Sequence, residues 1–217
     1  VGGCSSINGM IYRRGQAQDY DRWADFTEDE EWSWEKLLPH FKRGEDYYGG
    51  HNSFHGAGGE WRVEQARVRW KALDIWMKAA EEIGIPRTND FNTGNNFGSG
   101  YFDVTQKDGW RLNAYQAFVD PIIKKRDNLD VMIASNVSSL VFDVVTNRGQ
   151  ARMVQGGLGF GSLKCIGVEH SNSGGVTEMV RARKEVILAS GSIGSVQILE
   201  RSGIGQGERL TRLGVPV

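Results

Sequence analysis

The most regular hydrophobic pattern in the chain lies between Trp70 and Ile83. Apolar residues recur there at steps of three and four, as on one face of a helix: Leu73, Trp76, Met77, Ala80 and Ile83. Gly84 and Pro86 follow and indicate the end of that helix. Because aromatic residues at helical spacing usually pack in a core, Trp76 is predicted to be buried.

Less regular patterns flank this segment. Ser33 is placed to cap a helix that continues to Arg43, and Pro39 is expected to interrupt or restart it. Leu112–Lys125 is predicted to be helical with a break at Pro121.

Loops are indicated by glycine and small polar residues. Gly44–Gly59 is rich in glycine, and Pro86–Gly100 is rich in Asn, Thr and Gly. Tyr101–Thr105 is predicted to be a short strand, followed by a turn at Lys107–Gly109. Tyr101 and Trp110, which lie beside these loops, are the aromatic residues that we consider as candidates for a substrate pocket.

The second half of the chain changes to β-branched and aromatic segments separated by turn signals. The predicted strands are Leu129–Ala134, Val137–Val145, Cys165–Ser171, Val176–Ala182 and Glu185–Ala189. The last of them is apolar on both faces, as is typical of a buried parallel strand, and a helix is predicted over Gly194–Arg201. The pattern predicts an α/β fold with α+β elements, in which antiparallel and parallel strands are interleaved.

Composition narrows the class of protein. The 217 residues are 39% hydrophobic and 24% charged with a net charge of −1, which suits a globular chain and gives no basic surface for nucleic acid. No apolar run approaches the roughly 18 residues of a membrane helix. Cys4 and Cys165 are too few for a disulfide framework, so a cytoplasmic setting is the default and the localisation is otherwise undetermined.

The richest candidate chemistry stands at the start of the chain, in Val1–Met10. Gly2 and Gly3 have no Cβ and permit close approach of a ligand, and successive N–H groups in such a turn suit a phosphate. Asn8 offers a donor and an acceptor for the edge of a heterocycle, and Met10–Tyr12 could form an apolar wall. The alternative is an ordinary loop rich in glycine and serine.

A second candidate is the predicted strand, turn and helix over Glu185–Gly203. Small residues at Ala189–Gly191 would put backbone N–H groups at the carboxyl edge of a sheet, where α/β folds bind ligands. The alternative is that these residues only allow the helix to pack closely against the strand.

Three further motifs are set aside. Ser190–Ser192 lacks the G-x-S-x-G turn of a hydrolase. Gly157–Gly161 has the wrong spacing for a dinucleotide loop and is predicted to be a loop between two strands. His51 and His55 have a metal-binding spacing, but the glycines around them indicate a loop, so no metal site is assigned.

Two separated segments together resemble the signatures of the glucose–methanol–choline (GMC) oxidoreductase family. The first is Gly2–Met10, continuing through Tyr12–Gly15 to Asp19–Trp23. The second is Ala189–Ser195 followed by Ser202–Gly205. Between them, the segments similar to the family are Trp32–Trp34, Leu37–Pro39 and His55–Gly59.

The resemblance implies an FAD flavoprotein, an oxidoreductase that acts on the CH–OH group of alcohols and is similar to choline dehydrogenases. It implies a fragment of a Rossmann-like FAD-binding domain with part of the substrate (cap) domain. The family's GxGxxG unit and catalytic histidine have no match here, so an internal fragment is expected. The expected segments are 1–43 (FAD loop and lid), 44–112 (substrate domain) and 113–217 (FAD-binding domain). Asn147–Lys164 looks longer than the family usually carries.

The resemblance also implies roles for individual residues. Cys4 matches a position beside the FAD pyrophosphate, Val137 matches one whose backbone holds the adenine, and Ile7 matches the position at which some members bond the flavin through a histidine. Isoleucine cannot form that bond, so non-covalent FAD is predicted. The predicted cofactor-binding residues are Gly2, Gly3, Cys4, Asn8, Gly9, Met10, Ile11, Val137, Ala189 and Gly191.

No catalytic residue is assigned, because no histidine here matches the family's proton acceptor. The family reaction is abstraction of the alcohol proton with hydride transfer to flavin N5. The implied partner is a small alcohol, and the electron acceptor stays open. The fragment alone is expected to be inactive and to hold FAD weakly. The alternative is a non-catalytic binding module that kept the FAD fold.

Overall fold

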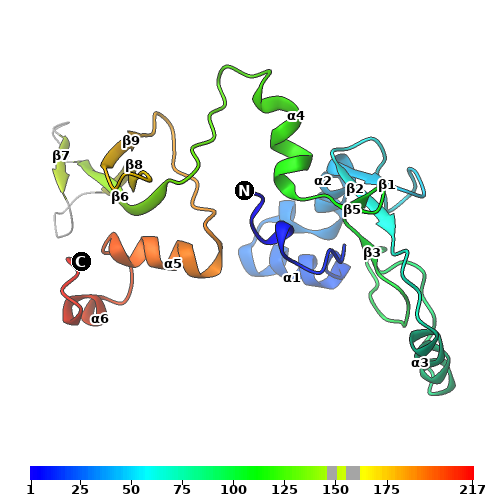
Figure 1. Ribbon diagram of the computed structural model, residues 1–217. Helices are drawn as coiled ribbons and strands as arrows, with labels where there is room; N and C mark the ends of the chain where they lie inside the picture. The colour runs from blue at the N-terminus through cyan, green and yellow to red at the C-terminus, as the bar shows by residue number, and fades with distance from the viewer. Residues whose placement is uncertain (146–150, 155–161) are drawn as a thin grey trace. The chain divides into compact units, whose positions relative to one another are not determined.

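The computed structural model describes residues 1–145, 151–154 and 162–217. They form two compact units, Val1–Asp130 (unit 1) and Val131–Val217 (unit 2), whose elements are labelled in Figure 1. Both units combine helices with sheets, which confirms the predicted α/β class with α+β elements. The three functional segments expected from the sequence are a different division of the chain and stay a prediction.

Unit 1 holds the helical elements that precede the second half of the chain. Its helices are α1 (Ala17–Thr27), α2 (Trp34–Gly44), α3 (Lys71–Glu82) and α4 (Asp120–Ile123). It also contains 3₁₀ turns at Gly3–Ser6 and Glu30–Trp32 and a π-helical turn at Tyr115–Val119.

Helix α1 has no regular apolar stripe, but it begins with a recognisable cap. The Asp19 carboxylate accepts a hydrogen bond from the Gln16 N–H at 2.8 Å. Tyr20 then packs its ring against Trp34 of α2 at 5.6 Å and against Phe41 at 5.6 Å. This packing explains why α2 continues through Pro39, where an interruption was predicted: the aromatic contacts outweigh the one backbone bond that proline removes.

A three-stranded sheet lies next to these helices. β1 (Glu45–Tyr47) runs parallel to β2 (Trp61–Gln65), and β3 (Asp103–Val104) is antiparallel to β2. The prediction that Gly44–Gly59 is entirely loop is therefore wrong at β1. The glycines there have a packing role, because a Cβ on Gly59 would collide with the backbone of Gly44.

The predicted turn after β3 is confirmed as a hairpin. β4 (Gln106–Lys107) pairs with β5 (Trp110–Arg111) in an antiparallel two-stranded sheet. The two residues between them, Asp108 and Gly109, have φ of 55° and 83°, as a tight right-twisted hairpin turn requires.

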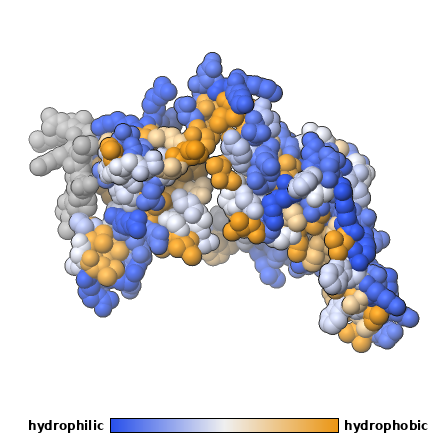
Figure 2. All heavy atoms as spheres, viewed as in Figure 1, coloured by the Kyte–Doolittle hydropathy of each residue, from blue (hydrophilic) through white to orange (hydrophobic). Residues whose placement is uncertain are grey.

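The predicted helix over Trp70–Ile83 is confirmed as α3, but its apolar face is not a core. Trp76 is 71% exposed, so the prediction that it is buried is wrong. Ala80 is the buried residue of this helix. Figure 2 shows apolar surface over α3, and the reason is that few elements of unit 1 pack against this helix.

Unit 2 is a four-stranded antiparallel sheet with two helices. The strand order is β7-β6-β8-β9, with β6 at Asn136–Val145, β7 at Ala151–Val154, β8 at Ser162–Ser171 and β9 at Thr177–Arg181. Helix α5 (Gly191–Arg201) packs on β6, and the Ser202 hydroxyl accepts the Leu140 N–H at 2.8 Å. α6 (Gly207–Arg212) follows and buries Leu210.

Two predicted strands are not formed. Leu129–Ala134 and Glu185–Ala189 are not in any sheet, and Ile133 and Ile187 are 72% and 81% exposed. A parallel strand needs a neighbour to satisfy its backbone groups, and no described strand pairs with either segment. Gly157–Gly161 lies outside the described residues. Across the described part of the chain, no helix combines the length and the apolar character needed to cross a membrane.

Candidate functional site

The glycine-rich start of the chain folds into a tight 3₁₀ turn at Gly3–Ser6. Gly2 precedes it with φ of 99°, a conformation that favours glycine. The N–H groups of Ile7 and Asn8 both donate to the Cys4 carbonyl, at 3.0 and 2.9 Å. The turn is thus closed by its own backbone, and its outer side is left on the surface.

Contacts from outside the turn then fix its position. The Arg111 guanidinium donates from Nη1 to the Ser5 carbonyl at 3.0 Å and to Asn8 Oδ1 at 2.9 Å. The Ala114 N–H donates to the Ser5 hydroxyl at 2.8 Å. Sequence reasoning missed Arg111, although its place two residues after the Asp-Gly turn of the hairpin is a signal that could have drawn attention to it.

Asn8 is left with only its amide N–H groups to offer a ligand. Its Oδ1 atom already accepts from Arg111 and from the Met10 N–H at 3.0 Å. The sequence predicted that the Asn8 side chain would offer a ligand both a hydrogen-bond donor and an acceptor, and the structure leaves only the donor available. Around Asn8 the loop is open: a Cβ on Gly3 or on Gly9 would meet no atom within 4 Å, and Cys4 is exposed.

The chain after the loop is bound to β3. The Met10 carbonyl accepts the Thr105 N–H at 2.8 Å, and Ile11 forms a bridge with Val104. Ile11 keeps 53% of its surface exposed and can face a ligand. Tyr12 is half-buried: its hydroxyl lies against the Arg14 guanidinium, and burial raises the pKa of this phenol to about 12.

A buried ionic network holds the far end of this segment. The Glu45 carboxylate, 1% exposed, accepts from Arg14 Nη2 at 2.8 Å and from the Gly56 N–H at 2.8 Å. His55, 0% exposed, contacts Glu45 Oε1 through Nδ1 at 3.0 Å and Asp90 Oδ2 through Nε2 at 2.9 Å. Two cations and two carboxylates therefore form one closed, net-neutral group.

The network determines its own charge state. Burial lowers the pKa of His55, but hydrogen bonds to Asp90 and Glu45 outweigh that effect and raise this pKa to about 9. Burial raises the pKa of Glu45 while its bonds to His55 and Gly56 lower it, and the net direction is down. His55 is thus an imidazolium at neutral pH. Both of its nitrogens are bonded to carboxylates, which leaves no lone pair for a metal.

A neighbouring carboxyl behaves in the opposite way. Asp103 lies at the edge of β3, where burial and the negative charge of Asp90 raise its pKa to about 6. The Tyr47 hydroxyl lies 3.4 Å from Asp103 Oδ2, and the Tyr47 ring stacks on His55 with 3.7 Å between centroids.

The remaining predicted cofactor residues lie in unit 2. Val137 stands near the start of β6 and pairs with His170 of β8. Ala189 is exposed, and Gly191 begins α5 with φ of 79° and with open space where a Cβ would be. The structure therefore brings together Gly2–Ile11 in unit 1 and places Val137, Ala189 and Gly191 in unit 2. A groove shared by the two sets stays a prediction.

Solved structures with a similar fold define the class of protein. Pyridoxine 4-oxidase from Mesorbium loti matches with a TM-score of 0.83 and 27% identity, covering 98% of this chain and 38% of that chain. An FAD-dependent oxidoreductase from Chaetomium thermophilum matches with a TM-score of 0.79 and 28% identity, covering 99% and 36%. This fold is that of FAD-dependent oxidoreductases.

Sequence comparison narrows the class to one family. The profile of the GMC oxidoreductases matches residues 1–215. Oxygen-dependent choline dehydrogenase 1 from Chromohalobacter salexigens is 35% identical in an alignment of 219 positions, gaps included, that covers 100% of this chain and 36% of that protein. The chain belongs to the glucose–methanol–choline (GMC) oxidoreductase family, whose cofactor is FAD. It spans about a third of the length of the curated relatives that it matches.

Proposed function

We propose that this chain forms the FAD-binding part of a flavoenzyme that oxidises a small alcohol, with a choline-like alcohol as the first candidate substrate. The observation that carries the proposal is the open loop at Gly2–Ile11, which is fixed from behind by Arg111 and presents the Asn8 amide outward. The substrate suggestion comes from the name of the choline dehydrogenase relative. The electron acceptor is left open.

Different residues of the loop would contact different parts of the cofactor. Gly3, where a Cβ would meet no atom within 4 Å, and the exposed Cys4 would lie beside the pyrophosphate. Gly2, where a Cβ would meet Ser6 and Asn113, would let the turn that carries them close up against the chain. Asn8 would donate from Nδ2 to an acceptor on the isoalloxazine edge, since its Oδ1 is already bonded to Arg111.

Apolar and backbone contacts would complete the site. Met10 and Ile11 would lie against the ring, Gly9 would allow its close approach, and the backbone of Val137 would hold the adenine. Ala189 and Gly191 would let the start of α5 come close to the cofactor.

FAD, when bound, supplies the hydride acceptor for the carbinol carbon. The residues described here bind and orient it, and none is assigned as the base that removes the alcohol proton. His55 is unsuited to that role, because it is fully buried and holds a proton between two carboxylates.

An FAD titration followed by quenching of flavin fluorescence tests the site. Gly9→Ala adds a methyl group where the protein has open space, so the fold should persist while FAD affinity falls about tenfold or more, equal to about 1.4 kcal/mol. Gly44→Ala is the matched control, because a Cβ at Gly44 also meets no atom within 4 Å. Equal affinities for the two variants would contradict the assigned position of the ring.

Non-covalent attachment is part of the proposal, because Ile7 has no group that can bond a flavin. Acid precipitation of the FAD-loaded chain should leave the flavin in the supernatant, and yellow protein in the pellet would refute this.

The competing function is a binding module that retains FAD without chemistry. Both functions require FAD binding, but only the enzyme's flavin is bleached anaerobically by choline or another small alcohol. That measurement is made on the full-length protein, and bleaching there rejects the binding module.

A further inference from the structure

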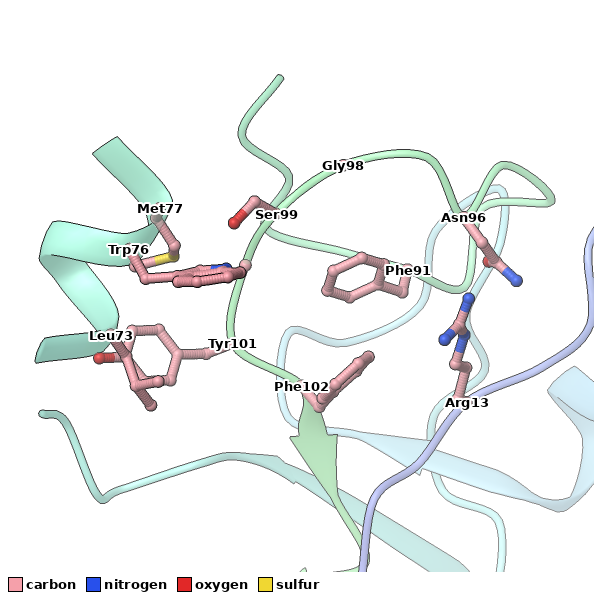
Figure 3. A pocket seen from close by; sticks show the side chains of 11 residues that line it. Arg13, Leu73, Trp76, Met77, Phe91, Asn96, Gly98, Ser99, Tyr101 and Phe102 are labelled. Atoms are coloured by element: carbon pink, nitrogen blue, oxygen red, sulfur yellow. The ribbon is translucent and has the colours of Figure 1, made fainter. Parts of the chain in front are cut away.

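Unit 1 contains a cavity of about 500 Å³ that the proposed FAD site does not use. It lies between α3 and the segment that leads into β3 (Figure 3). Trp76 and Met77 of α3 line one side, and Phe91 and Phe102 line the other. The volume is in the range of pockets that hold small organic ligands.

The aromatic walls are held in place by their own contacts. Phe91 is 6% exposed and its ring lies 4.7 Å from that of Phe102. Tyr101 is fixed from behind, since its hydroxyl donates to Asp74 Oδ1 at 3.0 Å. Trp76, by contrast, is 71% exposed and faces the cavity in Figure 3. Rigid rings on one side and an exposed indole on the other suit a flat, apolar ligand.

A positive charge stands at one end of the cavity. The Arg13 guanidinium lies 5.7 Å from the centre of the Phe91 ring and 5.8 Å from that of Phe102. Within the part of the chain that the structure describes, no carboxylate pairs with Arg13. An arginine in this setting suits the carboxylate of a ligand and disfavours a cationic one.

A buried acceptor without a partner lies at the same end. Asn96 donates from Nδ2 to the Arg14 carbonyl at 3.2 Å, which directs its Oδ1 atom elsewhere. That Oδ1 atom is buried and has no hydrogen-bond partner among the described residues. Figure 3 shows Asn96 and Arg13 next to one another at the cavity's end. A buried acceptor left unbonded destabilises the fold, so a donor on a ligand would be favoured there.

We infer that this cavity binds a small aromatic carboxylate that carries a hydroxyl or amino donor. The aromatic ring of the ligand lies between Trp76 and the two phenylalanines. The ligand's carboxylate pairs with Arg13, and its hydroxyl or amino group donates to Asn96 Oδ1. The site lies wholly in unit 1 and requires no FAD. A failure of this inference would therefore leave the proposed oxidoreductase function untouched, and the reverse also holds.

Isothermal titration calorimetry of the 217-residue chain without FAD tests the inference, with 3-hydroxybenzoate as the probe, because its hydroxyl and its carboxylate lie toward the same end of the ring. The expected result is saturable one-site binding that Arg13→Gln weakens at least tenfold, while Arg126→Gln, which removes an exposed charge elsewhere, leaves it unchanged. Circular dichroism confirms that each variant is folded. Absence of saturable binding, or equal weakening by both variants, overturns the inference.

Two further comparisons separate the recognition elements. Benzyl alcohol, which is neutral, and benzyltrimethylammonium, which is cationic, should each bind at least tenfold more weakly than 3-hydroxybenzoate. Benzoate lacks the hydroxyl donor and should bind to the unsubstituted chain more weakly than 3-hydroxybenzoate does. The two ligands should bind equally to Asn96→Leu. Equal or tighter binding of the cation would refute the role of Arg13. An unchanged preference for the hydroxyl in Asn96→Leu would refute the role of Asn96.

Discussion

Removing the Glu45 carboxylate is the sharpest test of how the segment that follows the loop at Gly2–Ile11 is held. Glu45→Ala leaves Arg14 and His55 buried without their shared counter-ion and leaves the Gly56 N–H without its acceptor. Breaking a buried pair by deleting one partner costs about 3–5 kcal/mol. With total stabilities of about 5–15 kcal/mol, that loss should be plain in an unfolding curve.

Urea unfolding followed by tryptophan fluorescence measures this loss of stability in unit 1, which contains Glu45. All seven tryptophans lie within Val1–Asp130, so the signal reports unit 1 alone. Glu45→Gln keeps the volume and removes the charge, and it should lie between the alanine variant and the unsubstituted chain. Glu60→Ala is the control, because Glu60 is exposed and its loss should change stability by less than about 0.5 kcal/mol. A cost below about 1 kcal/mol for Glu45→Ala would refute the reasoning.

Three other predictions follow from the same contacts. The pKa of His55 is about 9 in the folded chain and 6.5 in the unfolded chain, so protonation of His55 stabilises the fold by about 3 kcal/mol. This stabilisation is complete below pH 6.5, declines as the pH rises and is lost above pH 9. Urea midpoints measured between pH 6 and 10 should show the decline, and those of His55→Gln should not. Arg111→Gln should weaken FAD binding about tenfold with less than about 1 kcal/mol lost from stability, and an unchanged FAD affinity would show that the loop needs no anchor. His170→Leu should leave the stability of unit 2 unchanged or raise it by up to about 1 kcal/mol, as measured by circular dichroism, because both ring nitrogens are buried without a partner among the described residues; a clear loss of stability would refute this reasoning.

Local patterns predicted the elements whose partners are close in sequence. Helix α3 and strands β6, β8 and β9 follow from periodicity and turn signals, and the hairpin follows from its Asp-Gly turn. The family signatures led to the loop at the start of the chain because those residues are contiguous.

The rest depends on contacts between distant positions. Arg14, Glu45, His55 and Asp90 form one network although they are far apart in the sequence, and no periodic signal links them. Arg111 reaches back to Asn8 in the same manner. The segment Glu185–Ala189 has the composition of a parallel strand, but pairing is a property of its neighbours and cannot be read from composition.

The Arg111 anchor has a consequence for the chemical ageing of this loop. An asparagine followed by glycine is prone to deamidation, because a backbone nitrogen with no bulky side chain beside it can attack the carboxamide carbon and expel ammonia. Asn8 and Gly9 form such a pair on an exposed surface, yet the Asn8 oxygen is held from two sides. By restraining rotation of the carboxamide, Arg111 would protect the loop from conversion to aspartate or isoaspartate during storage, and with it the amide that we assign to cofactor recognition.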